Sequence, residues 1–239
     1  MPSIISATTT NGLSTSADNS GSLQLATNNG TTAVTIDTGQ NVGIGTASPN
    51  QKLQVNGNIM AANGTAGNPA YNFVGSSAIG MFTPDSGFSV AFSTSSTERM
   101  RINSNGQVTI PSQPYCLVGR SSGNVTPPSI IAFNQIGANT GSHYNTGTGR
   151  FTAPVAGNYF ITINALGTNS SGVEVSIRKN GGTVLNTRGG GATNYTSTAA
   201  SSVVAMAAGD YFEGWAEGAY VIEGTNGYAY TGMSVYLLG

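Results

Sequence analysis

Apolar and polar residues alternate in short runs along the first half of the chain, and the runs end at turns rich in glycine and asparagine. In AVTIDTGQNVGIG, Ile36 is followed six residues later by Val42 and eight residues later by Ile44. RMRINSNGQVTIP repeats this spacing after Ile102. Alternation with a period of two, broken by such a turn, predicts two β-hairpins of the same design.

These hairpins carry few apolar side chains, all of medium size. Two further strand-and-turn signals end at Asn29-Gly30 and at Asn56-Gly57. A two-stranded hairpin is marginal in water, and so thin a core cannot offset the chain entropy lost on folding. We therefore expect copies of the chain to share their cores around a three-fold axis, in a homotrimeric shaft. The residues predicted to face inward are Val34, Ile36, Val42, Ile44, Leu53, Val55, Met100, Ile102, Val108 and Ile110.

The second half of the chain has a different pattern, which begins after a group of prolines that includes Pro111 and Pro114. Short strand-like runs such as YFITINA, VEVSI, SVVAMAA, YFEGWAE and YTGMSVYLL follow at regular spacing, separated by glycine-rich turns. This pattern predicts a β-sandwich or jelly roll. The fold class is therefore all-β, with an attachment segment over residues 1–20, a β-repeat trimeric shaft over 21–112 and a jelly-roll head over 113–239.

The composition of the chain excludes some classes of binding partner. Charged residues make up 7% of the chain and the formal net charge is −1, whereas an ordinary soluble domain is about 25% charged. Binding to nucleic acid needs clustered Lys and Arg, so we expect no such partner. The first 51 residues hold no Lys or Arg, and no apolar run is long enough for a spanning helix. We therefore expect synthesis in a cytoplasm, no export and no membrane insertion.

The candidate catalytic groups are sparse. Glu213 and Glu217 lie four residues apart, which places them on one face of a strand but about 13 Å apart. The carboxylates of a glycosidase stand about 5–9.5 Å apart. His143 and Cys116 are single in the chain, and Asp210 follows a glycine as a turn-capping residue does. The sequence predicts no catalytic residues, no metal site and no cofactor.

Two segments of the first half resemble a known group of proteins. GIGTASPNQKLQVNG, residues 43–57, is similar to an element that recurs in bacteriophage tail-fibre and related virion proteins. Residues 72–110 resemble the longer unit that precedes this element in such fibres, although they end in VTIPS and not in a second GIGT. The resemblance implies a virion fibre, made in the host cytoplasm and attached to other virion proteins through its N-terminus.

A second resemblance covers about residues 113–239. It rests on the local text HYNTGTGRFTAPVAGNYF and on the spacing of Phe133, Asn139, Tyr144, Phe151, Gly157 and Tyr159. This ladder is similar to the signature of the globular head of complement component one-q (C1q) and its relatives, whose jelly roll is shared with tumour-necrosis factors (TNF). The expected head core is Phe133, Tyr144, Phe151, Tyr159, Ile161, Ile163 and Val235.

The C1q resemblance also implies a trimer. Ile161 and Ile163 stand where this family has aromatic residues, so the aromatic cluster of the core is thinner here. No Gly-X-Y period is present, which excludes the collagen stalk of the animal proteins. The β-repeat shaft takes its place, and that substitution points to a bacteriophage.

The function expected from the sequence is recognition of the host surface by the head of a tail fibre, with a surface glycan or an outer-membrane component as receptor. We expect the ligand-binding residues on two loops, 186–199 and 218–230. They are Arg188, Asn194, Tyr195, Tyr220, Asn226 and Tyr228. The tyrosines could instead pack between subunits. The alternatives for the whole chain are a structural tail or head fibre without a receptor, and a polysaccharide-degrading tailspike.

Overall fold

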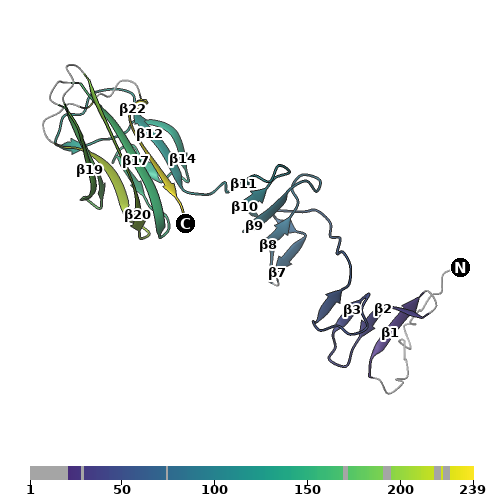
Figure 1. Cartoon of the computed structure of the whole chain (residues 1–239). Coiled ribbons are helices and arrows are strands. Elements are labelled where there is room, and N and C mark those ends of the chain that lie inside the picture. The colour runs from purple at the N-terminus through teal and green to yellow at the C-terminus, as the bar shows by residue number, and fades with distance from the viewer. Residues whose placement is uncertain are drawn as a thin grey trace. The chain divides into compact units, whose positions relative to one another are not determined.

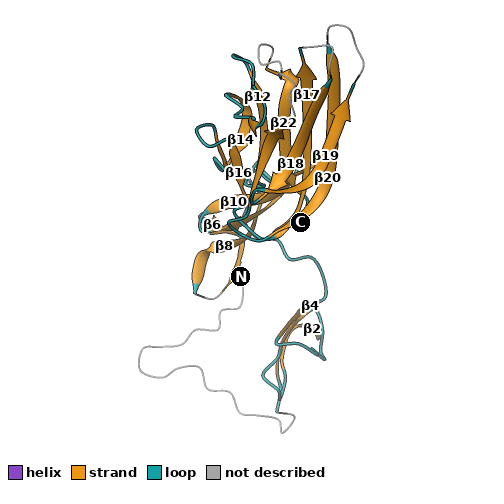
Figure 2. Cartoon of the chain, turned by 90° about the vertical axis from the view of Figure 1, so that its left-hand side faces the viewer, coloured by secondary structure: helices purple, strands orange, loops and turns teal. Residues whose placement is uncertain are grey.

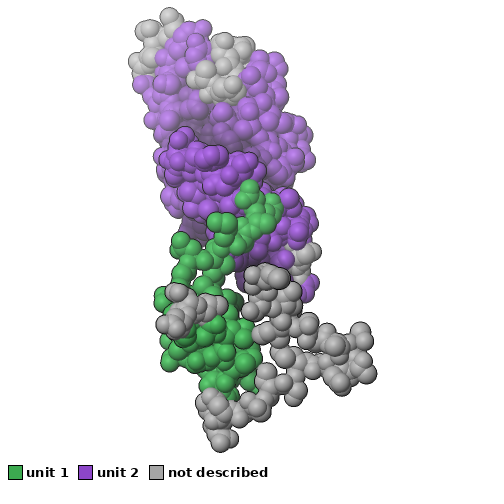
Figure 3. Space-filling view, turned by 90° about the vertical axis from the view of Figure 1, so that its right-hand side faces the viewer, with its two compact units in different colours: residues 1–64 green, residues 65–239 purple. Residues whose placement is uncertain are grey.

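All regular elements that the structure describes are β-strands (Figures 1 and 2). This confirms the all-β class. The chain divides into two compact units, Met1–Gly64 and Thr65–Gly239 (Figure 3). The computed structural model describes residues 21–27, 30–73, 75–168, 172–190, 195–217, 222 and 227–239.

The first unit contains one four-stranded sheet, which we call the first shaft sheet. Its strands, in spatial order, are β1 (Leu23–Thr27), β2 (Thr31–Ile36), β3 (Val42–Ile44) and β4 (Leu53–Val55). β2 and β3 form the predicted hairpin, with Ile36 opposite Val42 and Val34 opposite Ile44.

The strand expected before Asn56-Gly57 is present as β4, and it pairs with β3 in parallel. The connection from β3 to β4 passes close to β3, and its residues Thr46 and Pro49 lie against Gly43. A Cβ atom on Gly43 would stand 2.6 Å from the carbonyl oxygen of Thr46. This close approach therefore depends on a glycine at position 43.

Strand alternation gathers the aliphatic side chains of this sheet on one face. Two rows of directly opposed residues cross all four strands. They are Leu23–Ile36–Val42–Leu53 and Leu25–Val34–Ile44–Val55. Leu53 is 60% exposed and Ile44 43%, and no Val, Leu, Ile or aromatic side chain of the described residues 21–64 is buried. In a single chain the sheet thus has an apolar face and no core.

The second unit begins with a sheet of similar design, the second shaft sheet. Its strands are β7 (Tyr71–Phe73), β8 (Ser76–Phe82), β9 (Val90–Thr94), β10 (Thr97–Ile102) and β11 (Val108–Thr109), in the order β11-β10-β9-β8-β7. β10 and β11 form the second predicted hairpin, with Ile102 opposite Val108. Two short strands, β5 (Gly64–Thr65) and β6 (Asn68–Pro69), pair with each other.

Apolar rows cross one face of this sheet too. They are Tyr71–Met81–Phe92–Met100 and Val90–Ile102–Val108. Ile110 follows β11 and is 47% exposed. On the other face Phe82 and Ala91 are buried. This small core is all that the second shaft sheet supplies from its own described residues.

The head consists of two sheets. The first head sheet has the order β14-β12-β22-β17-β20 and the second has the order β15-β16-β21-β18-β19, with β13 also paired to β21. The strands of the first are β12 (Tyr115–Arg120), β14 (Gln135–Thr140), β17 (Gly157–Gly167), β20 (Thr196–Met206) and β22 (Gly227–Leu237). Those of the second are β13 (Ser129–Ile130), β15 (Tyr144–Asn145), β16 (Arg150–Thr152), β18 (Val173–Lys179), β19 (Gly182–Gly189) and β21 (Tyr211–Ala216).

The core of the head lies between these two sheets. All seven predicted core residues are buried there, and Tyr144, at 3%, is the most exposed of them. The Tyr144 hydroxyl accepts a hydrogen bond from the Phe133 backbone N–H and donates one to the Phe133 carbonyl. The side-chain amide of Asn139 bonds both the N–H and the carbonyl of Tyr144. The four aromatic residues of the sequence ladder, Phe133, Tyr144, Phe151 and Tyr159, thus meet in one packed cluster.

Candidate functional site

The outward side of the first head sheet carries no charge. Among the residues of its strands only Arg120 is charged, and its guanidinium donates to the carbonyls of Gly123 and Ala132. A row of half-exposed apolar residues crosses the sheet near the C-terminal end of β22. It is Val203–Phe160–Tyr236–Tyr115. Val203 is 55% exposed, so this row resembles an interface without its partner.

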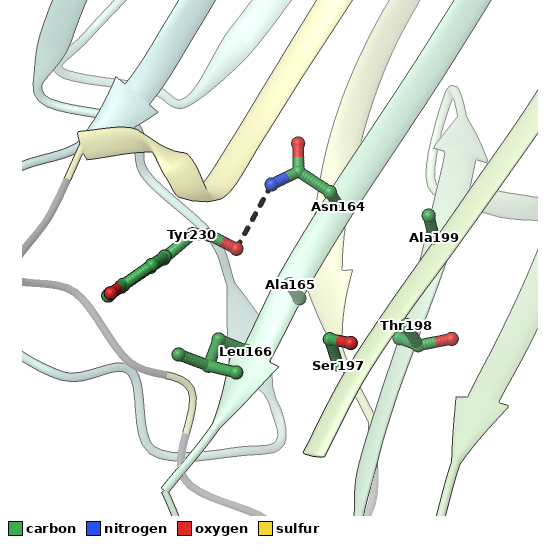
Figure 4. A pocket seen from close by; sticks show the side chains of 7 residues that line it. All are labelled: Asn164, Ala165, Leu166, Ser197, Thr198, Ala199 and Tyr230. Carbon is green, nitrogen blue, oxygen red and sulfur yellow. Dashed lines mark hydrogen bonds between the residues drawn. The ribbon is translucent and has the colours of Figure 1, made fainter. Parts of the chain in front are cut away.

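A groove of about 490 Å³ lies at the other end of the same outward side (Figure 4). Asn164, Ala165 and Leu166 of β17 stand between Tyr230 of β22 and residues 197–199 of β20. Asn164 donates a hydrogen bond of 3.0 Å to the Tyr230 carbonyl. The lining has one aromatic ring, one amide and two hydroxyls, and no ionisable group other than the phenol.

The outward side of the second head sheet, in contrast, carries charged residues. Phe212, Gly214 and Ala216 of β21 point into the core, so alternation turns Tyr211, Glu213 and Trp215 outward. All charged residues of the head strands other than Arg120 belong to this sheet. They are Arg150, Glu174, Arg178, Lys179, Arg188 and Glu213.

Two arginines organise this side. Arg150 Nε donates to Glu213 Oε2 over 2.9 Å, and its guanidinium lies 4.0 Å from the centre of the Tyr211 ring. Arg178 Nη2 donates to Glu217 Oε1 over 2.7 Å, and its guanidinium lies 4.0 Å from the Trp215 ring. Such stacked and paired arginines hold few alternative rotamers.

Two carboxylates of this side, Glu217 and Asp210, have lowered pKa values. Burial alone would raise the pKa of Glu217, but the hydrogen bonds from Ser176 and Arg178 and the charge of Arg178 outweigh it, so this pKa is lowered. Hydrogen bonds from Asn180, the Ala207 N–H and Lys179 lower the pKa of Asp210 to about 2. Asp210 therefore ties the turn before β21 to the end of β18.

Asp210→Asn should lower the thermal midpoint of the head at pH 7 by a few degrees, because Lys179 loses its charged partner. A carboxylate whose pKa falls from 3.8 to about 2 on folding stabilises the fold above about pH 4. That contribution disappears as the pH falls through the folded pKa. Melting curves from pH 7 to pH 2 should therefore converge for the two proteins. A constant difference between them would contradict this assignment.

The residues predicted to bind ligand are only partly described. Arg188 lies exposed on β19 opposite Glu174, and Tyr195 precedes β20 with 61% of its surface exposed. Asn194, Tyr220 and Asn226 lie outside the described residues, and so does the side chain of Tyr228, whose backbone belongs to β22.

The predicted loops are shorter than expected. β19 continues to Gly189, β20 begins at Thr196 and β22 begins at Gly227. β17 and β20 pair along their full length, up to Gly167 opposite Thr196, so regular strand occupies positions that were expected to be loop. The sequence analysis also missed Tyr211, Trp215, Arg150 and Arg178 as a cluster. The alternation of YFEGWAE, with aromatic and acidic residues at every second position, is the signal that could have found part of it.

The other chemical candidates have structural contacts. Glu213 and Glu217 pair with different arginines, the His143 ring packs against Phe151, and burial raises the pKa of the Cys116 thiol to about 12. Within the described ranges no three His, Cys, Asp or Glu residues gather as a metal site would need. Nor do those ranges contain a helix that is long and apolar enough to cross a membrane.

Comparison with known proteins shows which domain family the head is similar to. Residues 117–234 match the family model of the C1q domain. The globular domain of zebrafish complement 1qA protein superposes with a TM-score of 0.44 at 12% identity, over 53% of this chain and 98% of that one. Eiger TNF from S. frugiperda gives 0.43 at 10% identity, over 53% and 94%. No curated protein matches the chain. Residues 117–234 therefore form a C1q-type globular domain with a jelly-roll fold.

Proposed function

We propose that this protein is a homotrimeric fibre of a bacteriophage virion, a tail fibre, whose head recognises the host surface. C1q/TNF-like domains are typically binding modules that form homotrimers. The resemblance of residues 43–57 and 72–110 to tail-fibre repeats supplies the virion context. The protein would be made in the host cytoplasm and joined to other virion proteins through residues 1–20.

One observation carries this proposal: the head has a complete core of its own, and the shaft sheets do not. Buried aliphatic and aromatic side chains of the described chain are found almost entirely between Cys116 and Leu237. Each shaft sheet instead presents rows of apolar residues that a single chain leaves uncovered. Copies of the chain can bury these rows against one another, which a fibre requires and a monomeric module does not.

The first head sheet supports the same association. Its outward side combines the apolar row around Phe160 with a complete absence of charge along the outward positions of its strands. Interfaces between copies are depleted of charge at their centres and enriched in aromatic residues. We therefore place the contacts between heads on this side.

Competition for adsorption tests the recognition function. The isolated head, residues 113–239, has its own core and should fold alone. At saturating concentration it should reduce adsorption of the parent virion to its host several-fold, because soluble heads occupy the receptors. Three copies per fibre and many fibres per virion make even weak single contacts sufficient, so the head must be supplied in large excess.

The matched control is a head that has been unfolded by heat and cooled under conditions that prevent refolding. If the folded head never competes, the chain is a structural fibre without a receptor. Release of reducing ends from host polysaccharide by the intact protein, lost in Glu213→Gln, would instead support the tailspike.

A further inference from the structure

The two outward sides of the head are sorted by charge. The first head sheet keeps charged residues off its outward positions, and the second head sheet holds Arg150, Glu174, Arg178, Arg188 and Glu213. If copies associate through the uncharged side, the charged side remains on the outside of the assembly. It is then the sheet surface available to another molecule.

The strand register of the second head sheet brings these residues next to one another. Glu213 stands directly opposite Arg150 on β16 and opposite Arg178 on β18. Trp215 stands between Ser176 and Ile130, and Glu174 stands opposite Arg188. These positions lie on strands of one sheet and not on loops. Their spacing is therefore fixed by the sheet.

The side chains are also held in place. Glu213 is 2% exposed and Ser176 is fully buried, although both occupy outward positions. Arg150 and Arg178 make the contacts to them, at 2.9 and 3.3 Å. The Arg150 side chain still exposes 42% of its surface. Side chains ordered before binding lose little entropy when a partner arrives.

We propose that the outward side of the second head sheet, centred on Trp215, Tyr211, Arg150 and Arg178, is the surface through which the head docks on a protein of the host surface. This rests on the proposed recognition function. Trp, Tyr and Arg are the residue types that most often dominate the energy of protein–protein contacts.

The charge pattern and the ring contacts select a protein over a glycan. Positive and negative groups alternate across the strands, so a complementary partner must also carry both signs, as protein surfaces do. A polyanionic glycan offers a single sign and would meet the partly exposed carboxylates of Glu174 and Glu217. One face of the Tyr211 ring and one of the Trp215 ring are covered by guanidinium groups 4.0 Å away, which leaves less ring surface for stacking on a sugar.

The experiment measures binding of the fluorescent full-length protein to host cells of the parent virion. One sample of cells is treated with a protease, and another is oxidised with periodate to destroy sugar diols. Binding should be lost after the protease and kept after periodate. Loss with periodate alone would mean a glycan receptor and would overturn the protein assignment. If the wild type binds no cells at all, the proposed recognition function itself fails.

Variants locate the surface. Trp215→Ala should weaken binding on the order of 30-fold, as loss of a central aromatic anchor does. Asn186→Lys adds a long charged side chain beside Ser176 without touching the core, and it should also weaken binding at least tenfold. Ala208→Lys, in the exposed turn before Asp210, is the matched control and should bind like the wild type.

Light scattering and melting curves confirm that each variant remains folded and keeps its assembly state. If Trp215→Ala and Asn186→Lys both bind normally, the proposal is wrong. Loss of binding in Tyr195→Ala with normal binding by those two would move recognition to the loop predicted from the sequence.

Discussion

Ile44→Asp should open the first shaft sheet while the head stays folded. Ile44 lies in the middle of the row Leu25–Val34–Ile44–Val55 and is 43% exposed in a single chain. If three copies bury this row, the substitution places three carboxylates close together in an apolar interior. Each buried ion without a partner costs several kcal/mol, which is more than so thin a layer can supply. Residues 21–64 should then lose protection from a protease of broad specificity by at least tenfold, as followed by mass spectrometry.

The matched control is Gln24→Asp, on β1 and on the opposite face of the same sheet. Its carboxylate stays in water, so protection should equal that of the wild type. Ile102→Asp should act in the same way on the second shaft sheet and leave the first one protected. Full protection of residues 21–64 in Ile44→Asp would show that this face is not shared between copies. A monodisperse monomer of 24.2 kDa for the wild type would exclude the homotrimer altogether.

The hairpins of the shaft could be predicted because their signal is local. Period-two alternation and glycine turns act over about ten residues, and the pairs Ile36–Val42 and Ile102–Val108 follow directly from them. The parallel pairing of β4 with β3 could not be predicted in this way. It depends on the chain passing close to Gly43. A glycine allows such a close approach, but the sequence does not show which segment will make it.

The head was predictable for a different reason. Its core residues are large and their spacing is characteristic, so Phe133, Tyr144 and Phe151 could be assigned before any strand was placed. The surface network was not, because its members come from three separate segments. Arg150 reaches Glu213 across 63 positions, and Arg178 reaches Glu217 across 39. Only the sheet register brings such residues together, and no local pattern encodes it.

Phe151→Ala should severely destabilise the head. Phe151 is fully buried on β16, directly opposite Phe212 and Tyr144. Its ring centre lies 5.9 Å from that of Tyr159, in an edge-to-face contact between the two head sheets. Removing a buried phenylalanine ring loses its transfer free energy and leaves a cavity, at a cost of about 3–5 kcal/mol. Domains of this kind are stable by about 5–15 kcal/mol, so much of the margin disappears.

Urea unfolding of the isolated head, residues 113–239, measures this loss at fixed protein concentration, because the proposed association of copies would add to the apparent stability. Val155→Ala is the matched control: it also shortens an apolar side chain near Tyr159, but Val155 is 47% exposed. Its effect should stay within about 0.5 kcal/mol. A loss below about 1 kcal/mol for Phe151→Ala would mean that the ring does not join the two sheets. The spaced aromatic ladder would then not describe the core of this head.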